Sequence, residues 1–361
     1  MSGERARPFG APPLALAVDA NAFADDRRGM GRLARGAVTV FAQERAVNLT
    51  LLADSRNAAA LRDEFAGIAV QPQATARRRG RYDVVWFPFN GMRFAPAAPA
   101  VVTMHDAFAF TQPHPERIAR FREQAPMRRA ARLAARIAVD SQWTRAEIVR
   151  ELRPARCEPV VIAPVPDAFF FPDADAPPPP LDALPYVLLV GVREPRKNAR
   201  TALEACARSL RGDETLVVVG ELSARDRAFA RRSGVRCGEI AASDGVLRAL
   251  YRNARLVLVP SLGEGFGLVA VEAMACGAPV LASSAAALPE ATGGAAPLLD
   301  PHDSALWAQT IRLILDDPQR LAELRTRNVA RFAKADRETF ARGTLALLRE
   351  TAMLGDDRRN H

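Results

Sequence analysis

Lysine, histidine and cysteine, three residue types that often reveal a protein's chemistry, are scarce in this sequence. Among 50 basic residues only Lys197 and Lys334 are lysines, and there are four histidines. The four cysteines are widely spaced and none belongs to a C-x-x-C pair. This spacing argues against a disulfide framework or a zinc site, and it favours reduced thiols in a cytoplasmic protein.

Long apolar runs are also missing. No segment approaches the roughly 18 continuous apolar residues of a membrane span. The start of the chain combines early arginines with a short apolar run and so imitates a signal peptide, but Asp19 ends that run directly after Val18. We therefore expect a first β-strand there.

Two further kinds of site lack their motifs. No basic segment has interleaved aromatic residues or a recognition-helix pattern, which argues against nucleic acid as a partner. An Asp-x-Asp metal motif is formally matched at Asp173 and Asp175, but this match lies in a proline-rich segment. The sequence therefore predicts neither nucleic-acid binding nor a metal site.

Arginine is the residue present in excess. The net charge is +9, and residues 115–156 contain eleven arginines against five acidic residues. Much of this window has helical spacing with a loose apolar face. A basic amphipathic helix can lie on an anionic membrane surface. The alternative is a solvated arginine-rich face, because the whole sequence prefers arginine to lysine.

The length and the alternation of elements indicate two α/β domains. A chain of 361 residues is long for one core, and 49% hydrophobic residues can fill two. Short apolar runs alternate with helical patterns, as in α/β proteins. In the first half the expected strands are Leu14–Val18, Asn48–Leu52, Ile68–Gln71, Val84–Phe87, Ala100–Met104, Ile137–Val139 and Pro159–Ile162. In the second half they are Tyr186–Val190, Leu216–Val219, Val235–Cys237, Leu256–Val259 and Pro279–Ala282.

Four consecutive prolines mark the boundary between the two domains. We expect a first domain at residues 1–172, a semi-rigid extended linker at 173–184 and a second domain at 185–335. The pattern is helical after Asp300, so residues 336–361 are expected to end the chain as a helix.

The most informative segment follows the apolar run Leu256–Val259. Gly265 and Gly267 lie in the loop after this run, and a segment with helical spacing comes next. A glycine loop and a helix N-terminus can together hold a phosphate, because the main chain approaches closely and its N–H groups point at the ligand. Glu264 and Glu272 bracket this N-terminus, separated by about 12 Å of helix rise. That separation is comparable to the span from the sugar of a nucleotide-sugar to its ribose.

Other polar residues follow expected strands, where open α/β sheets bind ligands. Arg196 and Lys197 come after one such strand, and two adjacent cations suit a diphosphate. His105 ends another strand. The alternatives are ordinary surface cations for Arg196 and Lys197, a solvated helix acid for Glu272, a helix-dipole acid for Glu264 and a structural hydrogen-bonding histidine for His105.

These motifs resemble the retaining glycosyltransferases of family four, which have the GT-B fold. The spacing of Glu264 and Glu272 within EGFGLVAVEAMACGAPV closely resembles the E-x7-E signature of that family. The resemblance covers nearly the whole chain. Four more segments match the family in the same chain order, namely Gly29–Arg32, His105-Asp106, Gly191–Asn198, and Leu288–Glu290 followed by Asp300-Pro301.

The resemblance implies two Rossmann-like β/α/β domains facing a cleft. The N-terminal domain would bind the acceptor, the C-terminal domain would bind the nucleotide-sugar, and the last helix would cross back to the N-terminal domain. The implied catalytic residues are Glu264, His105, Arg196 and Lys197. The implied nucleotide-sugar-binding residues are Gly29, Gly31, Arg196, Lys197, Gly265, Phe266, Gly267, Leu268 and Glu272.

Each side chain has an implied role. Glu264 would contact the donor sugar, Glu272 the ribose hydroxyls, and His105 the transferred sugar near its reacting carbon. Asp106 would contact the acceptor or cap the next element. Because a free nucleotide carries no donor sugar, we expect loss of Glu264 to leave nucleotide affinity nearly unchanged.

The function implied by the resemblance is retaining, metal-independent hexosyl transfer without a cofactor. Similarity of GVREPRKN to enzymes of bacterial surface-polysaccharide assembly favours mannose from GDP-mannose and a glycan or lipid-linked acceptor, with UDP- and dTDP-sugars left open. The expected location is the cytoplasm, peripheral on the inner face of the cytoplasmic membrane. A nucleotide-sugar epimerase and a catalytically silent scaffold of a glycan assembly complex are the alternatives.

Overall fold

The computed structural model describes residues 12–24, 26, 29–171, 185–333, 335–336 and 338–357. The proline-rich linker expected at 173–184 lies outside these residues. The chain forms two compact units. The first comprises the described residues of Met1–Asp140, Thr144–Ala163 and Glu338–His361, and the second those of Ser141–Trp143 and Pro164–Arg337.

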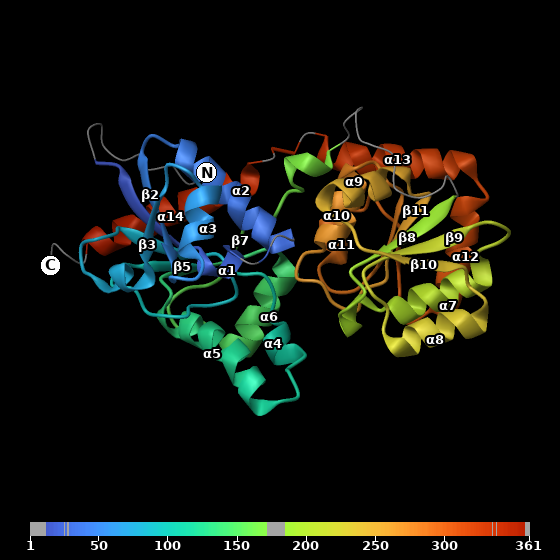
Figure 1. Ribbon diagram of the computed structural model, residues 1–361, viewed down its shortest axis with the longest axis horizontal. Helices are drawn as coiled ribbons and strands as arrows, with labels where there is room; N and C mark the ends of the chain where they lie inside the picture. The colour runs from blue at the N-terminus through green and yellow to red at the C-terminus, as the bar shows by residue number, and fades with distance from the viewer. Residues whose placement is uncertain are drawn as a thin grey trace. The chain divides into compact units, whose positions relative to one another are not determined.

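The first unit is built on a seven-stranded parallel sheet with the strand order β3-β2-β1-β4-β5-β6-β7 (Figure 1). Parallel strands covered on both faces are apolar along their length, and every residue of the central strands β4 and β5 is buried. The strands are β1 (Leu14–Asp19), β2 (Val47–Ala53), β3 (Ala69–Pro72), β4 (Val84–Phe87), β5 (Ala100–Met104), β6 (Arg136–Val139) and β7 (Val160–Val161).

Alternate residues of β4 enter two different apolar cores. Val84 and Trp86 face the core that contains helices α2 and α14, whereas Val85 and Phe87 face the core that contains α5 and α6. The helical elements in this part of the chain are α1 (Asn21–Ala24), α2 (Gly29–Gln43), α3 (Ala58–Glu64), η1 (Gln73–Arg77), α4 (Phe108–Thr111), α5 (Arg117–Leu133), α6 (Gln142–Leu152), and, at the end of the chain, α14 (Thr339–Asp357).

The second unit has a six-stranded parallel sheet with the order β10-β9-β8-β11-β12-β13. Its strands are β8 (Tyr186–Val190), β9 (Thr215–Val219), β10 (Cys237–Ile240), β11 (Leu256–Val259), β12 (Val280–Ser283) and β13 (Leu298–Leu299). Two apolar cores again cover the two faces, one with α9, α10 and α13, the other with α7 and α12. The helical elements are η2 (Ala168–Phe170), η3 (Pro195–Lys197), α7 (Ala199–Ser209), α8 (Ala224–Ser233), α9 (Asp244–Asn253), α10 (Leu268–Ala275), α11 (Leu288–Thr292), α12 (Ser304–Leu315) and α13 (Pro318–Phe332).

Both units are thus Rossmann-like parallel α/β domains, which confirms the predicted fold class. The observed strands coincide with the predicted ones within one or two residues, except at β10, which begins at Cys237 where the prediction ended it. This edge strand exposes Gly238 and Glu239, so it lacks the apolar run on which the prediction relied. The two-residue strand β13 had no prediction because it is too short to show a pattern.

The first unit ends before the predicted boundary at residue 172. Its second segment stops at Ala163, and the residues that follow pack with the second unit. Phe170 in η2 is fully buried there, with its ring 6.0 Å from that of Tyr251. At the other end of the chain, α14 packs with the first unit, where it contacts α2 and β4.

Candidate active site

In the second sheet the strand order reverses between β8 and β11. The chain leaves β8 toward β9 on one side and leaves β11 toward β12 on the other. Such a switch point leaves a crevice outside the carboxyl ends of the two strands, where open α/β sheets bind ligands. The loops at this point are residues 191–198 after β8 and residues 260–267 after β11.

Glu264 lies buried where these two loops meet. Its Oε1 accepts hydrogen bonds from Lys197 Nζ at 2.8 Å and from Ser261 Oγ at 2.7 Å. Its Oε2 accepts one from Arg196 Nη1 at 2.9 Å. The Glu264 side chain is 6% exposed, and those of Arg196 and Lys197 are 15% and 12% exposed. The structure therefore brings three of the predicted catalytic residues into one contact cluster.

The charges in this cluster stabilise one another. Burial alone would raise the pKa of Glu264, but Lys197 and Arg196 outweigh it and hold that pKa below its ordinary value. Burial opposes the charged form of Arg196, whereas Glu264 and then Glu194 favour it, and the net effect raises the pKa of Arg196. Glu264 is thus a carboxylate that neutralises cations within the protein.

Asn198 fixes the cationic loop beside the loop after β11. Its backbone is left-handed, with φ of 54°, a conformation that asparagine tolerates better than most residues. Its side-chain Nδ2 donates to the carbonyl oxygens of Pro260 at 3.0 Å and Pro301 at 2.8 Å. This anchor positions Arg196 and Lys197, the residues immediately before it.

Gly267 starts helix α10 and needs to be glycine. Its φ is 109°, and a Cβ there would lie 2.8 Å from Leu288 Cδ2. The first N–H groups of a helix have no partner within the helix, so α10 can offer them to an anion. The side chain of Phe266 is buried in the apolar core, against which Leu268 also packs. Of these two predicted donor-binding residues, Phe266 therefore leaves only its main chain for a ligand, whereas Leu268 is partly buried.

Glu272 is a buried carboxylate in an apolar stretch of α10. The residue is 5% exposed, and its neighbours Val271 and Ala273 are fully buried. The hydroxyl of Tyr251 lies 3.5 Å from its Oε2. Ribose hydroxyls are hydrogen-bond donors of the kind that a buried carboxylate accepts. The contact with ribose stays a prediction.

In the first unit, His105 follows β5 and has protein partners at both ring nitrogens. Nδ1 lies 2.7 Å from Asp140 Oδ2, and Nε2 lies 2.8 Å from the Pro88 carbonyl oxygen. A carbonyl oxygen only accepts, so Nε2 carries a proton and donates. Burial lowers the pKa of His105, but Asp140 raises it more, and the net direction is upward. These contacts correspond to the alternative in which His105 is a structural hydrogen-bonding residue. A contact of His105 with the transferred sugar stays a prediction.

Asp106 takes part in a small polar network beside His105. Asn90 Oδ1 accepts from the His105 backbone N–H at 2.7 Å, and Asn90 Nδ2 lies 3.3 Å from Asp106 Oδ1. Asp106 Oδ1 also accepts from the backbone N–H of Phe108 at 3.1 Å. Of its two predicted roles, the structure contains the capping contact with α4.

Asp19 is a candidate that the sequence interpretation missed. It ends β1 at the switch point of the first sheet, between β1 and β4, and is 2% exposed. Gln73 Nε2 donates to its Oδ1 at 2.9 Å. Burial raises the pKa of Asp19, and the Gln73 hydrogen bond offsets this only in part. A buried acid at this edge is a candidate substrate contact, and its place at the end of the first strand was the available signal.

Gly29 and Gly31 lie at the start of α2, also near the end of β1 in sequence. A Cβ on Gly31 would lie 1.8 Å from the carbonyl oxygen of Asp26, so this close approach of two backbone segments requires glycine. The predicted contact of the two glycines with a diphosphate is untested. Among the described residues, no group of three or more His, Cys, Asp and Glu could hold a metal ion.

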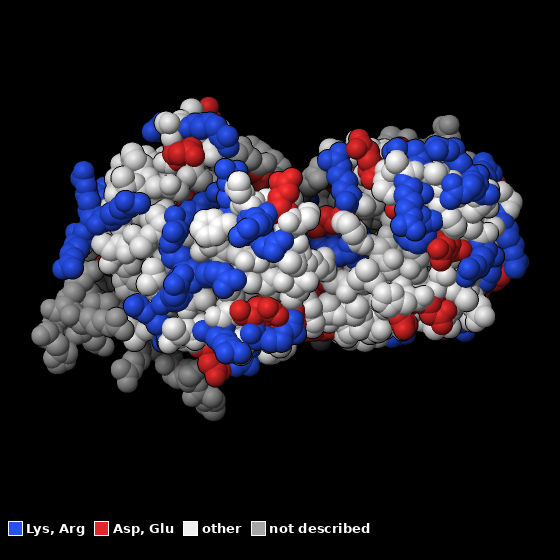
Figure 2. All heavy atoms as spheres, turned by 90° about the horizontal axis from the view of Figure 1, so that it is seen from below, with Lys and Arg blue, Asp and Glu red and all other residues white. Residues whose placement is uncertain are grey.

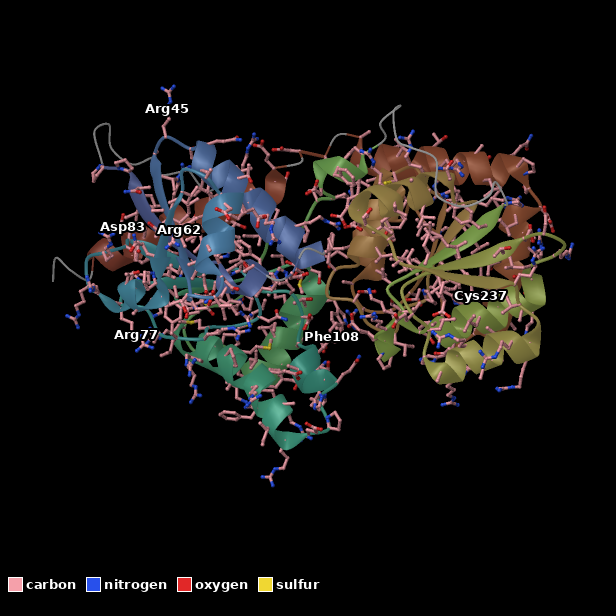
Figure 3. All side chains as sticks on the ribbon, viewed as in Figure 1. Arg45, Arg62, Arg77, Asp83, Phe108 and Cys237 are labelled. Atoms are coloured by element: carbon pink, nitrogen blue, oxygen red, sulfur yellow. The ribbon has the colours of Figure 1, made fainter. Side chains whose placement is uncertain are left out.

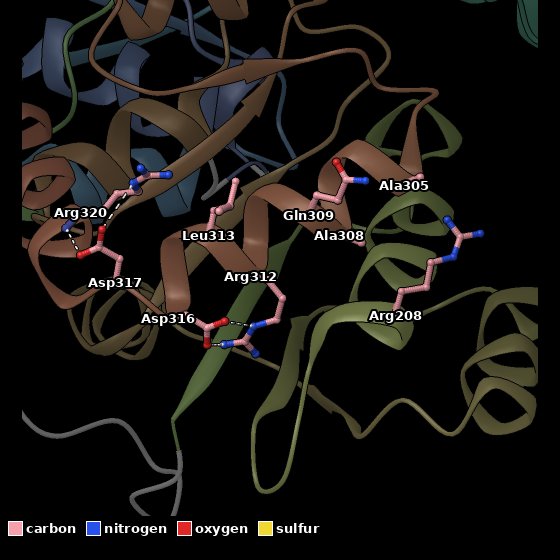
Figure 4. Close-up of a pocket in the computed structure, with 9 residues that line it drawn as sticks. All are labelled: Arg208, Ala305, Ala308, Gln309, Arg312, Leu313, Asp316, Asp317 and Arg320. Atoms are coloured by element: carbon pink, nitrogen blue, oxygen red, sulfur yellow. Dashed lines mark hydrogen bonds and ion pairs between the residues drawn. The ribbon is translucent and has the colours of Figure 1, made fainter.

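A pocket of about 790 Å³ lies elsewhere on the second unit, along α12 (Figure 4). Arg312 pairs there with Asp316 and with Glu214, and Arg320 lies 3.9 Å from Asp317. The pocket contains none of the predicted site residues, and acids already neutralise two of its arginines. The candidate site is therefore the switch point and not this pocket.

The second unit matches a known protein family. Residues 184–317 match the family model described as "Glycosyl transferases group 1". The chain is 32% identical over 244 residues to O-antigen chain mannosyltransferase B of Escherichia coli, covering 61% of this chain and 62% of that protein. It is 52% identical over 77 residues to D-inositol 3-phosphate glycosyltransferase 1 of Catenulispora acidiphila, covering 21% and 18% of the two chains. Each match thus spans less than two thirds of the relative's length.

Solved structures with a similar fold include glycosyltransferases. WaaG, a glycosyltransferase involved in lipopolysaccharide biosynthesis, superposes with a TM-score of 0.68 at 18% identity, covering 93% of this chain and 99% of that one. Anabaena Alr3699/HepE in complex with UDP-glucose gives a TM-score of 0.68 at 19% identity, with the same coverage. At such identities the likeness shows the fold alone, and that fold is GT-B.

Proposed function

We propose that this protein, whose residues 184–317 form a group 1 glycosyl transferase domain, moves a hexosyl group from a nucleoside diphosphate sugar to a glycan or lipid-linked acceptor. The observation that carries the proposal is the buried cluster of Glu264, Arg196 and Lys197 at the switch point of the second sheet. Paired cations beside a glycine loop and a helix N-terminus suit a diphosphate, because charge-assisted hydrogen bonds from both sources converge on it.

In the proposed reaction the configuration at the anomeric carbon is retained. The acceptor hydroxyl bonds to that carbon on the face from which the diphosphate departs, while the bond from carbon to phosphate oxygen breaks. The hydroxyl proton passes to the departing phosphate, so no protein nucleophile is needed. Arg196, Lys197 and the N–H groups at the start of α10 stabilise the negative charge on the leaving group. The proposal includes no metal and no cofactor.

The donor we propose is GDP-mannose, used in the assembly of a bacterial surface polysaccharide. The 32% identity to an O-antigen chain mannosyltransferase supports mannose as the sugar. The competing donor is a UDP-sugar, because similar folds have been solved with UDP and with UDP-glucose.

A thermal-shift panel of GDP, UDP, ADP and dTDP tests this function. A ligand that binds only the native state at about 100 times its Kd adds roughly 2.7 kcal/mol to the free energy of unfolding. We expect GDP to raise the melting temperature by a few degrees, and more than the other three. A larger rise with UDP would change the donor, and no rise with any nucleotide would contradict the function. Conversion of one nucleotide-sugar into its epimer without an acceptor would indicate the epimerase instead.

We further propose that the first unit docks on the cytoplasmic face of an anionic membrane through α5, bringing a lipid-linked acceptor close. Ile118 and Phe121 on this helix are 69% and 71% exposed and lie three residues apart, so they share a face. Large exposed apolar side chains among arginines are typical of a helix that lies in a membrane interface. The exposed arginines of α5 are Arg117, Arg122, Arg128 and Arg132.

The alternative, a solvated arginine-rich surface, is visible elsewhere on the protein. Arg45, Arg62 and Arg77, labelled in Figure 3, are exposed elsewhere in the first unit. Figure 2 shows Lys and Arg spread over one face with acidic side chains between them. Charge alone therefore does not distinguish α5, and the strongly exposed Ile118 and Phe121 do. No helix in the described part of the chain is long and apolar enough to cross a membrane.

Sedimentation with vesicles tests the membrane proposal. We expect binding to vesicles with anionic lipid, little binding to neutral ones, and weaker binding at high salt, because salt screens the attraction. Ile118→Asp with Phe121→Asp should reduce binding at least about a hundredfold, since inserting each such side chain contributes roughly 1.5–3 kcal/mol and each 1.4 kcal/mol is about tenfold. Leu313→Asp is the matched control, as Leu313 on α12 is 58% exposed but lies in the other unit. Equal sedimentation with both lipids, or none, would rule out docking.

A further inference from the structure

The Glu264 carboxylate binds two cations, Arg196 and Lys197, through separate oxygens, as a phosphate would. One oxygen binds Lys197 at 2.8 Å and the other binds Arg196 at 2.9 Å, while Ser261 donates to the first at 2.7 Å. Arg196 also contacts Glu194 through its Nε and Nη2, both 2.7 Å from one carboxylate oxygen. Two positive and two negative side chains therefore balance to zero charge at the place where a diphosphate is to bind.

We propose that Glu264 is an internal counterion that positions Arg196 and Lys197 and limits how tightly the protein holds a diphosphate. This inference rests on the function proposed above, since it concerns the same cations. A diphosphate that arrives must compete with the carboxylate for both of them. After transfer, the carboxylate can reclaim the cations as the nucleoside diphosphate leaves. Glu264 thereby acts on product release as well as on the order of the site.

Burial decides which of the two acids matters more. The side chain of Glu264 is 6% exposed and that of Glu194 is 57% exposed. Solvent screens an exposed ion pair strongly, so its net contribution is small. A buried pair is screened much less, and removing one partner leaves the other charge uncompensated. Loss of the Glu264 charge should therefore leave Arg196 and Lys197 as a strong anion site.

This inference reverses the sequence-based expectation for Glu264. From the resemblance alone, its loss should leave the affinity for a free nucleotide nearly unchanged, because the free nucleotide has no donor sugar for Glu264 to contact. With the carboxylate bound to both cations, we instead expect Glu264→Gln to bind diphosphates more tightly. The glutamine keeps the shape of the side chain and removes the charge.

Calorimetry with inorganic pyrophosphate and the full chain tests the inference. We expect Glu264→Gln to bind pyrophosphate about tenfold more tightly than the wild type, with transfer slowed and inhibition by the product nucleoside diphosphate about tenfold stronger. Adding Lys197→Ala to Glu264→Gln should remove most of the gain, because the freed ammonium is one of its two sources. A full tenfold gain that survives the second substitution would overturn the mechanism.

A matched control separates this effect from general loss of structure. Glu214 is a partly buried carboxylate of the second unit, its side chain 10% exposed, that pairs with two arginines outside the site, Arg255 at 3.1 Å and Arg312 at 2.6 Å. Glu214→Gln should lower the melting temperature without changing pyrophosphate binding. If Glu264→Gln does not fold, Glu194→Gln decides, because this exposed acid also balances Arg196. It should tighten binding about twofold to threefold, and unchanged or weaker binding would contradict the inference.

The remaining outcomes distinguish the two proposals. A wild-type protein that binds pyrophosphate, together with a folded Glu264→Gln variant that binds it equally or more weakly, would overturn the counterion role and leave the glycosyltransferase function intact. A wild type that binds neither pyrophosphate nor any nucleoside diphosphate would remove the proposed function and the counterion role together.

Discussion

Replacing Lys197 with alanine should lower kcat/KM for sugar transfer about a hundredfold. The ammonium donates to the buried Glu264 carboxylate and is one of the two cations offered to the diphosphate. A hydrogen bond to a charged group contributes roughly 1.5–3 kcal/mol, and each 1.4 kcal/mol is about tenfold. We expect the upper end, because the Glu264 charge would keep only Arg196 as a close basic partner and would then repel the phosphates.

Steady-state kinetics and calorimetry with the nucleoside diphosphate would measure this effect. Lys197→Arg preserves the charge but not the compact shape of the ammonium, so it should recover part of the activity. Arg208→Ala, in the pocket along α12, should leave transfer unchanged. A folded Lys197→Ala protein with normal donor affinity and turnover would refute the assigned role.

Replacing Glu272 with glutamine should weaken binding of the free nucleoside diphosphate roughly tenfold to a hundredfold, the opposite direction from Glu264→Gln. Glu272 is buried in α10, so ribose hydroxyls that lose a carboxylate acceptor there cannot turn to water instead. Losing a charged hydrogen-bond partner of this kind costs roughly 1.5–3 kcal/mol. Calorimetry on the two single variants would show directly whether the substitutions change the affinity for the nucleoside diphosphate in opposite directions.

The ribose contact has its own control in the ligand. A nucleoside diphosphate that lacks both ribose hydroxyls should bind the wild type and Glu272→Gln with similar affinity, since the contact is absent from both complexes. If Glu272→Gln weakened this analogue as much as the natural nucleotide, Glu272 would be supporting α10 and not binding ribose. If Glu264→Gln and Glu272→Gln changed the affinity for the nucleoside diphosphate in the same direction, the two different roles assigned to these acids would be wrong.

Local patterns were sufficient for the architecture. Buried parallel strands such as β4 and β11 are continuous apolar runs, because both of their faces are covered, and such runs stand out in a sequence. Gly267 and the residues around it lie within one short segment, so the loop and the start of α10 could also be predicted. Elements that depend on distant partners escaped: the edge strand β10 is half-polar, and Phe170 joins the second core through Tyr251.

Residue types near strand ends could be predicted from the sequence, but their partners could not. The sequence identified Glu264, Arg196 and Lys197 as site residues, yet it assigned the acid to the sugar and the cations to the diphosphate. Only the tertiary structure showed that the acid binds both cations across 67 and 68 positions of sequence. The tertiary structure likewise showed that His105 pairs with Asp140 and that Asp19 is buried beside Gln73. The physical reason is that burial and charge pairing depend on which loops meet at a sheet edge, and strand order, which is not a local property, determines that meeting.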